Sequence, residues 1–354
     1  MYSGYETLVK ELSERLVKKG HFVRVYCHRQ LFNEKPKNIN GIELVYTPSI
    51  ETKFLSQFIN SFFSFIHACF SSIDVILVVN SANGPFGILT RFFNKKTCIN
   101  VDGLEWLRPK WKGLGSLYFK FSSKLSTILF DMIITDSKEM SKIYSNNFNK
   151  ISSTIAYGPT MVKSKNRIIL KKYNLKQNQY YLIVGRLIPD NNSLLILKGF
   201  LKSKSRKKLV IVGDVPYRDS YSENLKSFSR SNIIFTGYVR SQEFLSCLYK
   251  NCYGYIHGHE YGGTNPTMVN ALYLNSQILA LNTIFNKEML NNKKAILFNK
   301  DVDSVSDGIL NFEKNYNQLV KKNMNFKISE IYNWDKISEK YLEIFFKVTN
   351  YQNK

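Results

Sequence analysis

Short apolar runs alternate with longer stretches of helical periodicity along the whole chain. Several runs, such as the one that starts at Val75 and the one that starts at Met132, are apolar almost throughout. Such runs are typical of strands buried on both faces of a parallel sheet, and their alternation with helices indicates βαβ units. The expected strands are Phe22–Cys27, Glu43–Thr47, Asp74–Val79, Thr97–Val101, Asp131–Thr135, Thr154–Tyr157, Tyr180–Val184, Lys208–Val212, Asn232–Thr236, Cys252–His257, Gln277–Leu281 and Lys294–Phe298.

Two series of these units divide the chain into two domains. A length of 354 residues corresponds to about two domains of ~150 residues, and Gly158-Pro159 interrupts the alternation near the middle. We therefore expect an α/β fold with two Rossmann-like, doubly wound domains facing a cleft, residues 1–158 and 159–333. Residues 334–354 contain a helical pattern that is expected to return to the first domain.

The first domain departs from the usual doubly wound pattern where it begins. Such domains usually open with a buried strand and a glycine-rich turn into the first helix. Here a helical pattern over Glu6–Lys19 comes first and ends at Gly20. We therefore expect the first strand of the N-terminal domain to be missing, with only Ser3-Gly4 in place of the glycine-rich turn.

The charge balance limits the partners. Lys and Arg number 50 and Asp and Glu 27, so the net charge is 50 − 27 = +23, which favours nucleic acid, an anionic membrane or a phosphorylated ligand. No helix-turn-helix, zinc or RNP-like motif is present, so we expect no nucleic-acid partner. Five scattered cysteines without a CxxC indicate reduced thiols in the cytosol. We find neither a signal-peptide pattern nor an apolar run long enough to span a bilayer.

The most informative segment is His-Gly-His-Glu-Tyr-Gly-Gly-Thr-Asn-Pro, which begins at residue 257. It follows an expected strand and opens a helix that Thr264 or Asn265 can cap. Gly262 and Gly263 let backbone N–H groups approach a ligand closely, and the helix N-terminus favours a phosphate. We interpret the segment as a phosphate-binding loop rather than an ordinary strand–turn–helix junction.

This segment resembles the nucleotide-sugar site of glycosyltransferase family 4, in particular that of bacterial rhamnosyltransferases of capsule, O-antigen and exopolysaccharide assembly. The resemblance covers nearly the whole chain and includes Gly4-Tyr5-Glu6-Thr7, the run from Asn100 to Trp106, and Val184-Gly185-Arg186-Leu187-Ile188-Pro189. It implies a two-domain GT-B fold and metal-independent sugar transfer with retention at the anomeric carbon.

Gly185 and Arg186 follow a strand whose carboxyl end is expected at the cleft, where doubly wound sheets bind ligands. A guanidinium there can clamp a diphosphate leaving group and stabilise its growing charge; the alternative is a surface salt bridge. Many family members add a lysine five residues later, where this chain has Asn191. The resemblance and the loop pattern together give the expected donor-binding residues as Gly4, Gly185, Arg186, His257, His259, Gly262, Gly263, Thr264, Asn265 and Asn270.

The loop that follows the expected strand Thr97–Val101 offers two carboxylates beside an indole ring, which suits hydrogen bonding and stacking on a sugar. By resemblance, Asp102, Glu105 and Trp106 contact the acceptor or the transferred sugar; the alternative is that the acids cap the next segment. Asp102 joins Arg186 as a catalytic candidate. It is not assigned as a base, because retaining transfer in this family is usually assisted by the leaving group.

Two departures from the family pattern bear on activity. Asn270 replaces the glutamate that hydrogen-bonds the nucleotide ribose, and losing one charge-assisted bond costs ~1–2 kcal/mol. Gly262 stands where the broader family has the first of two glutamates, and Glu260, two residues away, is given no such role. With the missing first strand, these departures leave a second interpretation open, a degenerate and non-catalytic family member.

Metal binding is not expected. The pair Asp301 and Asp303 matches a motif that holds a metal in other sugar transferases, but it precedes a helical pattern over Ser304–Phe312 and is interpreted as a helix cap. His257 and His259 are two apart at a strand end and are expected to line the donor site. We therefore expect no metal and no cofactor, since the nucleotide sugar is a substrate.

Two segments are candidates for a membrane surface. Phe54–Phe70 carries no charge and has apolar residues at helical spacing, which favours a helix packed on the core over membrane contact. The run 108–112 (Arg-Pro-Lys-Trp-Lys), with Tyr118, Lys120 and Lys124 after it, mixes cations and aromatics on an expected exposed rim. That composition is typical of an interfacial membrane patch, or of a solvated basic loop.

These expectations combine into one function. The chain is expected to be a glycosyltransferase, cytoplasmic and peripheral on the inner face of the cell membrane. It would extend a polyprenyl-diphosphate-linked glycan in bacterial surface polysaccharide synthesis. The resemblance favours dTDP-rhamnose as the donor, and UDP- and GDP-sugars stay open because no residue pattern reports on the base.

Overall fold

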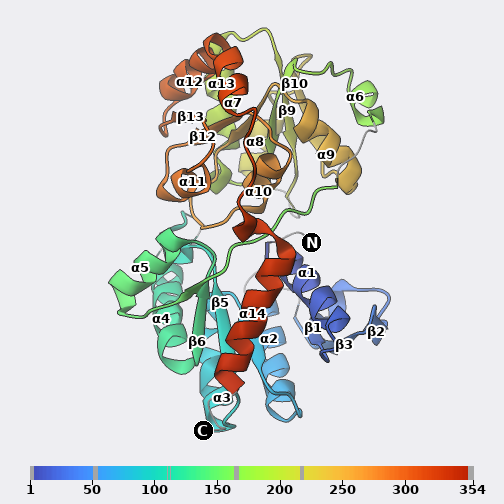
Figure 1. Cartoon of the computed structure of the whole chain (residues 1–354), viewed down its shortest axis with the longest axis vertical. Coiled ribbons are helices and arrows are strands. Elements are labelled where there is room, and N and C mark those ends of the chain that lie inside the picture. The colour runs from blue at the N-terminus through green and yellow to red at the C-terminus, as the bar shows by residue number, and fades with distance from the viewer. Residues whose placement is uncertain are drawn as a thin grey trace. The chain divides into compact units, whose positions relative to one another are not determined.

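A computed structural model describes residues 4–50, 55–109, 111, 113–162, 167–215 and 219–349 (Figure 1). The chain divides into two compact units. We call residues 2–157 with 333–354 the N-terminal unit, and residues 158–332 the C-terminal unit. None of the helices in the described ranges is long and apolar enough to cross a membrane.

The C-terminal unit contains one six-stranded sheet in which every neighbouring pair of strands is parallel. Its strands are β8 (Tyr180–Val184), β9 (Lys208–Val212), β10 (Ile233–Gly237), β11 (Gly254–His257), β12 (Ile278–Leu281) and β13 (Ile296–Phe298). The order is β10-β9-β8-β11-β12-β13. The winding therefore starts at β8, runs outward to β10, and resumes on the other side of β8 with β11, as in a doubly wound fold.

Helices cover this sheet. They are α6 (Ile168–Lys172), α7 (Ser193–Ser203), α8 (Ser220–Lys226), α9 (Gln242–Asn251), α10 (Pro266–Tyr273), α11 (Ile284–Met289), α12 (Val302–Lys314) and α13 (Tyr316–Lys322), with 3-10 turns η4 (Pro189–Asn191) and η5 (Glu330–Tyr332). Helix α7 packs against α12, and α6 against α9. Buried side chains such as Leu209, Ile256 and Val305 join the strands, α7 and α12 in one apolar core.

The N-terminal unit has two sheets instead of the expected single one. One is parallel, in the order β4 (Ile76–Val79), β5 (Thr97–Val101), β6 (Met132–Thr135) and β7 (Ser153–Thr154). The other has the order β1 (Arg24–His28), β3 (Ile42–Thr47) and β2 (Asn38–Ile39). Within the described ranges no strand pairs with both β1 and β4, so the two sheets stay separate, and the first described element is a helix.

The remaining elements of this unit are α1 (Gly4–Lys18), α2 (Leu55–Cys69), α3 (Gly87–Phe92), α4 (Leu114–Leu129), α5 (Lys138–Phe148) and α14 (Trp334–Thr349), with the 3-10 turns η1 (Arg29–Leu31), η2 (Ser81–Phe86) and η3 (Glu105–Leu107). The last helix, α14, lies beside α1 (Figure 1). Leu12, Ile337 and Tyr341 are buried in their shared core, and Arg15 Nε lies 2.8 Å from Asp335 Oδ1 across the two helices.

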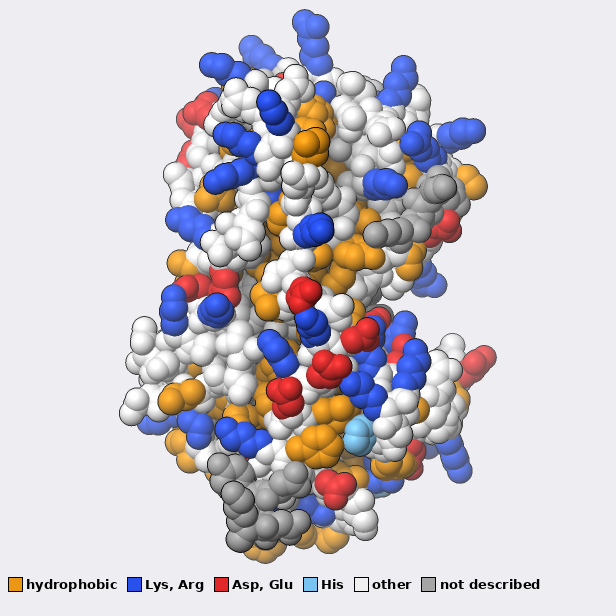
Figure 2. All heavy atoms as spheres, in the orientation of Figure 1, with side chains coloured by type: hydrophobic (Ala, Val, Ile, Leu, Met, Phe, Trp, Pro, Cys, Tyr) orange, Lys and Arg blue, Asp and Glu red, His pale blue; other side chains and the backbone are white. Residues whose placement is uncertain are grey.

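The positively charged side chains are scattered over the face shown in Figure 2. Lys and Arg side chains are spread over both units there, and acidic side chains lie among them around α1 and α14. The charge on this face therefore does not collect into one basic stripe of the kind that follows a nucleic-acid backbone.

The sequence predicted an exposed rim at residues 108–112, and this prediction is wrong for Arg108 and Trp111. Arg108 is buried, with its Nε 3.0 Å from Glu105 Oε1. Trp111 is half-buried and donates its indole N–H to Glu105 Oε2 at 2.9 Å. Because a buried carboxylate needs such partners, both side chains turn inward. Lys110 and Lys112 lie outside the described residues.

Candidate active site

The candidate donor site lies at the carboxyl ends of β8 and β11. The strand order reverses between these two strands, and in open α/β sheets ligands bind in the crevice at such a switch point. The loop after β8 carries Gly185 and Arg186, and the loop after β11 carries the His-Gly-His and Gly-Gly motifs. The fold therefore brings together two segments that lie about 70 residues apart in the sequence.

Asparagines tie these two loops to each other. Asn191 donates its Nδ2 to the carbonyl of Arg186 at 2.7 Å, and its Oδ1 lies 2.9 Å from His259 Nδ1. Since an amide oxygen only accepts, this contact assigns the imidazole proton of His259 to Nδ1. Asn192 donates to the carbonyl of Gly258 at 2.9 Å. The residue that stands in the place of a family lysine thus positions the backbone of Arg186, whose own side chain is exposed.

Close backbone contacts make two glycines necessary in this region. A Cβ on Gly258 would lie 2.5 Å from the Asn191 carbonyl oxygen. A Cβ on Gly213, at the end of β9, would lie 1.9 Å from the Gly185 carbonyl oxygen, and Gly213 has a φ of +134°. The loop that presents Arg186 is therefore packed against neighbouring backbone on two sides.

Helix α10 begins beside these loops. Asn265 caps it by accepting the N–H of Thr267 at 3.0 Å, as expected from the sequence, and Pro266 occupies the first turn. Gly262 has a φ of +148°, a conformation that side chains disfavour. Gly263 and Thr264 are buried just before the cap. The helix N-terminus supplies unpaired N–H groups and partial positive charge, which suit a phosphate.

Asn270 hydrogen-bonds within the C-terminal unit. Its Oδ1 accepts the backbone N–H of Thr160 at 2.9 Å, and its Nδ2 donates to Thr160 Oγ1 at 3.4 Å. The side chain is 4% exposed. The position that carries a ribose-binding glutamate in the family thus holds the segment that follows Gly158-Pro159.

His257 is neutral and enclosed. It is 2% exposed, and burial lowers its pKa from 6.5 to about 3. Tyr255 donates its hydroxyl to Thr267 Oγ1 at 2.8 Å and lies 2.8 Å from His257 Nδ1, so the imidazole donates from Nδ1. Its Nε2 is buried without a hydrogen-bond partner in the described residues. His257 is therefore packed beneath the loop, against Tyr255, and is not exposed to solvent.

This burial predicts an acid-sensitive contribution of His257 to stability. The His257 imidazole binds a proton near pH 6.5 in the unfolded chain and only near pH 3 in the folded chain. The neutral His257 side chain therefore contributes fully to the unfolding free energy above pH 6.5. As the pH falls from 6.5 towards 3, this contribution is lost at about 1.4 kcal/mol per pH unit. Between pH 6.5 and 5 we expect His257→Gln to lose about 2 kcal/mol less unfolding free energy than the wild type in urea titrations. Equal slopes for the wild type and His257→Gln would refute the assignment.

Asp102 belongs to a polar cluster in the N-terminal unit. Tyr157 donates to Asp102 Oδ2 at 3.1 Å, and Tyr5, next to Gly4 in the first turn of α1, donates to the Asp102 carbonyl at 3.2 Å. Asn100 donates to Tyr341 at 2.8 Å beneath them. Burial, and then the charge of Asp102, raise the pKa of Tyr5 and Tyr157. The half-buried Asp102 is thus held in a fixed orientation by neutral hydroxyls.

Glu105 and Trp106, the other two expected acceptor residues, pack within this unit. Both carboxylate oxygens of Glu105 are engaged, one by Arg108 and one by Trp111. The ring of Trp106 lies edge-on to Tyr144, with centroids 6.1 Å apart, and is partly exposed. Glu105 therefore shapes the loop, while Asp102 and Trp106 keep exposed surface.

Asp301 of the Asp-x-Asp pair caps helix α12, as expected, while Asp303 lies in the first turn of that helix. Asp301 Oδ1 accepts the N–H of Ser304 at 2.6 Å at the start of α12, and Asp303 pairs with Lys202. Among the residues that the structure describes, no three His, Cys, Asp or Glu side chains form a group that could hold a metal ion.

Several residues of these clusters escaped the sequence analysis as site components. Asn192, Tyr157 and Thr160 contact site residues only through the fold. Their one sequence signal is position: Tyr157 and Thr160 flank the Gly158-Pro159 break, and Asn192 lies in the segment between β8 and α7. Asp136, buried at the end of β6, also raises the pKa of Tyr5 and Tyr157 through its charge.

Comparisons with known proteins agree with this architecture. Residues 165–328 match the family model "Glycosyl transferases group 1", and residues 59–160 match "Domain of unknown function (DUF1972)". No curated protein sequence matches the chain.

Among solved structures, sucrose-phosphate synthase from Thermosynechococcus elongatus is similar, with a TM-score of 0.80 at 14% identity over 98% of this chain and 94% of that one. HepE from Anabaena, in complex with UDP and glucose, has a TM-score of 0.74 at 12% identity, over 97% and 95%. A glycosyltransferase from Rickettsia africae has a TM-score of 0.70 at 14% identity, over 96% and 93%.

Proposed function

This chain carries a glycosyl transferases group 1 domain and has the GT-B fold, and from that premise we propose that it transfers a sugar from a nucleotide sugar to a lipid-linked glycan. The observation that carries the proposal is the pair of loops at the switch point between β8 and β11. Arg186 extends from one loop, and the other leads into the N-terminus of α10. A cation beside a helix N-terminus supports binding of a diphosphate.

The chemistry proposed for these groups is stabilisation of the leaving group. When the glycosidic bond to the nucleotide breaks, negative charge grows on the diphosphate. The Arg186 guanidinium and the N–H groups before α10 can hydrogen-bond that charge without a metal ion. Asn191 and His259 contribute indirectly, because they hold the Arg186 backbone. Asp102 is proposed to position the acceptor or the transferred sugar.

The donor and acceptor follow from the sequence resemblance. We propose L-rhamnose from dTDP-rhamnose as the transferred sugar, with retention, and a polyprenyl-diphosphate-linked glycan as the acceptor, at the inner face of the cell membrane. HepE is described with UDP and with glucose, which supports a nucleotide-sugar site on this fold and keeps UDP-sugars in the test.

Nucleotide binding tests the donor site. We expect one of dTDP, UDP, GDP and ADP to raise the melting temperature selectively, with or without Mg²⁺. At ~100 times its Kd a ligand adds ~2.7 kcal/mol to the unfolding free energy. Stabilisation only in the presence of Mg²⁺ would contradict metal independence. No shift with any nucleotide would contradict the donor site and favour a non-catalytic relative.

A further inference from the structure

Helix α4 is packed with its polar side inward. Its buried residues are Phe119, Ser122, Ser123, Ser126 and Thr127. Ser122 donates to the carbonyl of Ser81 at 2.6 Å. A Cβ on Gly84 would lie 2.1 Å from the Ser122 carbonyl oxygen, so the helix and η2 approach closely through small residues. Apart from Phe119, the inner side of α4 thus consists of small residues that allow this close approach.

Large apolar side chains of α4 point outward. Leu114 is 85% exposed, Leu117 63%, Phe121 57% and Ile128 58%. Their spacing of three, four and seven residues places them on one side of the helix. Such an arrangement is the reverse of an ordinary surface helix, in which the apolar stripe faces the core.

Helix α3 extends this apolar surface. Arg91 of α3 donates to the carbonyl of Leu129 at the end of α4 at 2.7 Å, so the two helices adjoin. On α3, Ile88 is 59% exposed and Phe92 83%. We call Ile88, Phe92, Leu114, Leu117, Phe121 and Ile128 the α3–α4 face. A cluster of exposed large apolar side chains on a soluble unit indicates a surface that binds something.

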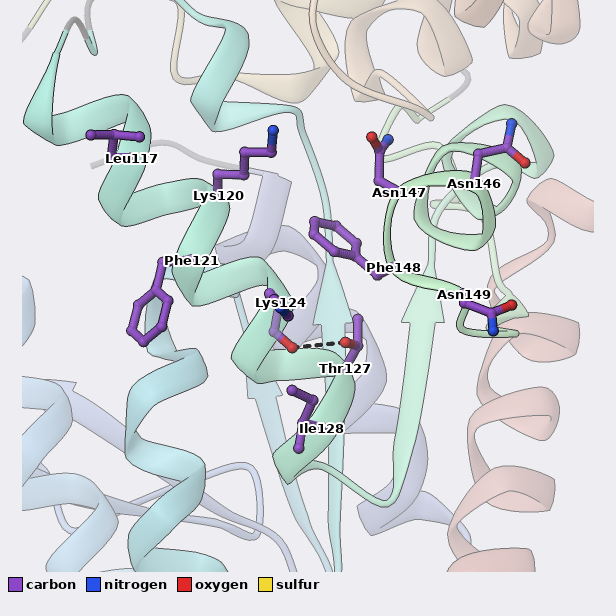
Figure 3. A pocket seen from close by; sticks show the side chains of 10 residues that line it. All are labelled: Leu117, Lys120, Phe121, Lys124, Thr127, Ile128, Asn146, Asn147, Phe148 and Asn149. Carbon is purple, nitrogen blue, oxygen red and sulfur yellow. Dashed lines mark hydrogen bonds between the residues drawn. The ribbon is translucent and has the colours of Figure 1, made fainter.

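Basic residues accompany the face. Residues 74–131 contain eight Lys or Arg and four acids, Asp74, Asp102, Glu105 and Asp131, and Arg91 of α3 pairs with Asp131 at 3.1 Å. Asp131 is half-buried, whereas Lys120 and Lys124 are exposed. Lys120 and Lys124 lie on α4 beside Phe121 and border a groove of about 620 Å³ that also contacts the end of α5 (Figure 3). Leu117, Phe121 and Ile128 line the same groove, so apolar side chains and lysines of α4 lie together there (Figure 3).

From this juxtaposition we propose that the α3–α4 face docks on an anionic lipid bilayer, with Leu117 and Phe121 in the acyl boundary and Lys120 and Lys124 on headgroup phosphates. Exposed apolar side chains flanked by lysines have the chemistry of an interfacial helix. The inference rests on the proposed function for its purpose, since a lipid-linked acceptor lies in such a bilayer.

Vesicle co-sedimentation tests the docking. We expect the full chain to bind vesicles of two parts phosphatidylcholine to one part phosphatidylglycerol, and to bind pure phosphatidylcholine at least tenfold more weakly. Leu117→Ser with Phe121→Ser should lower binding at least tenfold. Lys120→Gln with Lys124→Gln should lower it about tenfold or more at low salt. As matched controls, Ile151→Ser with Met324→Ser, and Lys198→Gln with Lys250→Gln, remove exposed side chains of the same kinds elsewhere and should bind as the wild type does.

Two results would overturn the docking. One is equal vesicle binding by the wild type and both α4 variants. The other is a dimeric wild type that does not bind vesicles and becomes monomeric on Leu117→Ser with Phe121→Ser, which would make the face a contact between two copies. The melting-temperature shift with nucleotides should be the same in all variants, so a failure of docking is distinguishable from a failure of the donor site.

Discussion

Replacing Arg186 by alanine is expected to lower kcat for sugar transfer by about 10²–10³-fold, which corresponds to about 3–4 kcal/mol of transition-state stabilisation. The reason is that the side chain lies beside the expected diphosphate position. With asparagine at residue 191, no second side-chain cation follows in this loop. Arg186 is exposed, so its removal opens no cavity and the melting temperature should be unchanged. Steady-state kinetics with the best donor would measure the effect.

Two further variants sharpen this test. Arg186→Lys keeps the charge but not the planar pair of donors, and should recover part of the activity. Arg206→Ala removes an equal charge from another exposed position of the same unit and should leave kcat unchanged. A fully active Arg186→Ala would show that the guanidinium does not touch the leaving group.

Gly213→Ala is expected to unfold or severely weaken the C-terminal unit. The new Cβ would lie 1.9 Å from the Gly185 carbonyl oxygen, and φ at this residue is +134°. Because the contact is backbone to backbone, only a shift of the loop relieves it. The combined strain is about 3–6 kcal/mol, comparable with the whole stability of many domains. Urea denaturation measures the loss, and nucleotide binding should fall with it because Arg186 follows Gly185.

Gly237→Ala separates the clash from the backbone strain. Gly237 also has a positive φ, +66°, but no atom lies within 4 Å of its added Cβ. It should cost about 1–2 kcal/mol and leave nucleotide affinity unchanged. If the two alanine variants were equally stable, the close approach of β9 to the Arg186 loop would not exist in solution.

The sequence pattern predicted the sheets well wherever strands are buried on both faces. Thr97–Val101, Tyr180–Val184 and Lys208–Val212 have the expected bounds, and nearly all of their residues are buried, as in strands covered on both faces. The two-residue strand β2 was missed, since Asn38-Ile39 is too short for any period. The expected strand Thr154–Tyr157 pairs only as Ser153–Thr154.

The candidate site was predictable in position but not in detail. Strand ends and glycines located the loops of Arg186 and His259. The bond between Asn191 and His259 could not be predicted, because it joins distant parts of the chain. Because Arg108 is charged, the sequence predicted that it would be exposed. In the structure it is buried because it pairs with the buried Glu105. In α2, Phe65 and Ala68 are buried but Phe58 and Phe63 are 47% and 41% exposed, so the expected core helix is only partly covered.

The inverted helix α4 shows why periodicity alone falls short. Leu117 and Phe121 have helical spacing and are exposed, whereas the serines of this helix face inward. The partner, η2, carries Ser81 and Gly84 and accepts only small side chains. Which side of a helix is buried depends on the size of the side chains opposite, and those residues belong to another segment.

The most direct test of the proposed sugar transfer is release of nucleoside diphosphate by the full chain. dTDP-rhamnose, UDP-glucose and GDP-mannose would each be supplied with membranes that carry polyprenyl-diphosphate-linked glycans. We expect release from one donor, with its sugar recovered in the lipid fraction, and we expect both signals to be lost in Arg186→Ala. If the folded chain bound a donor but released nucleoside diphosphate from none of the three, sugar transfer would be contradicted.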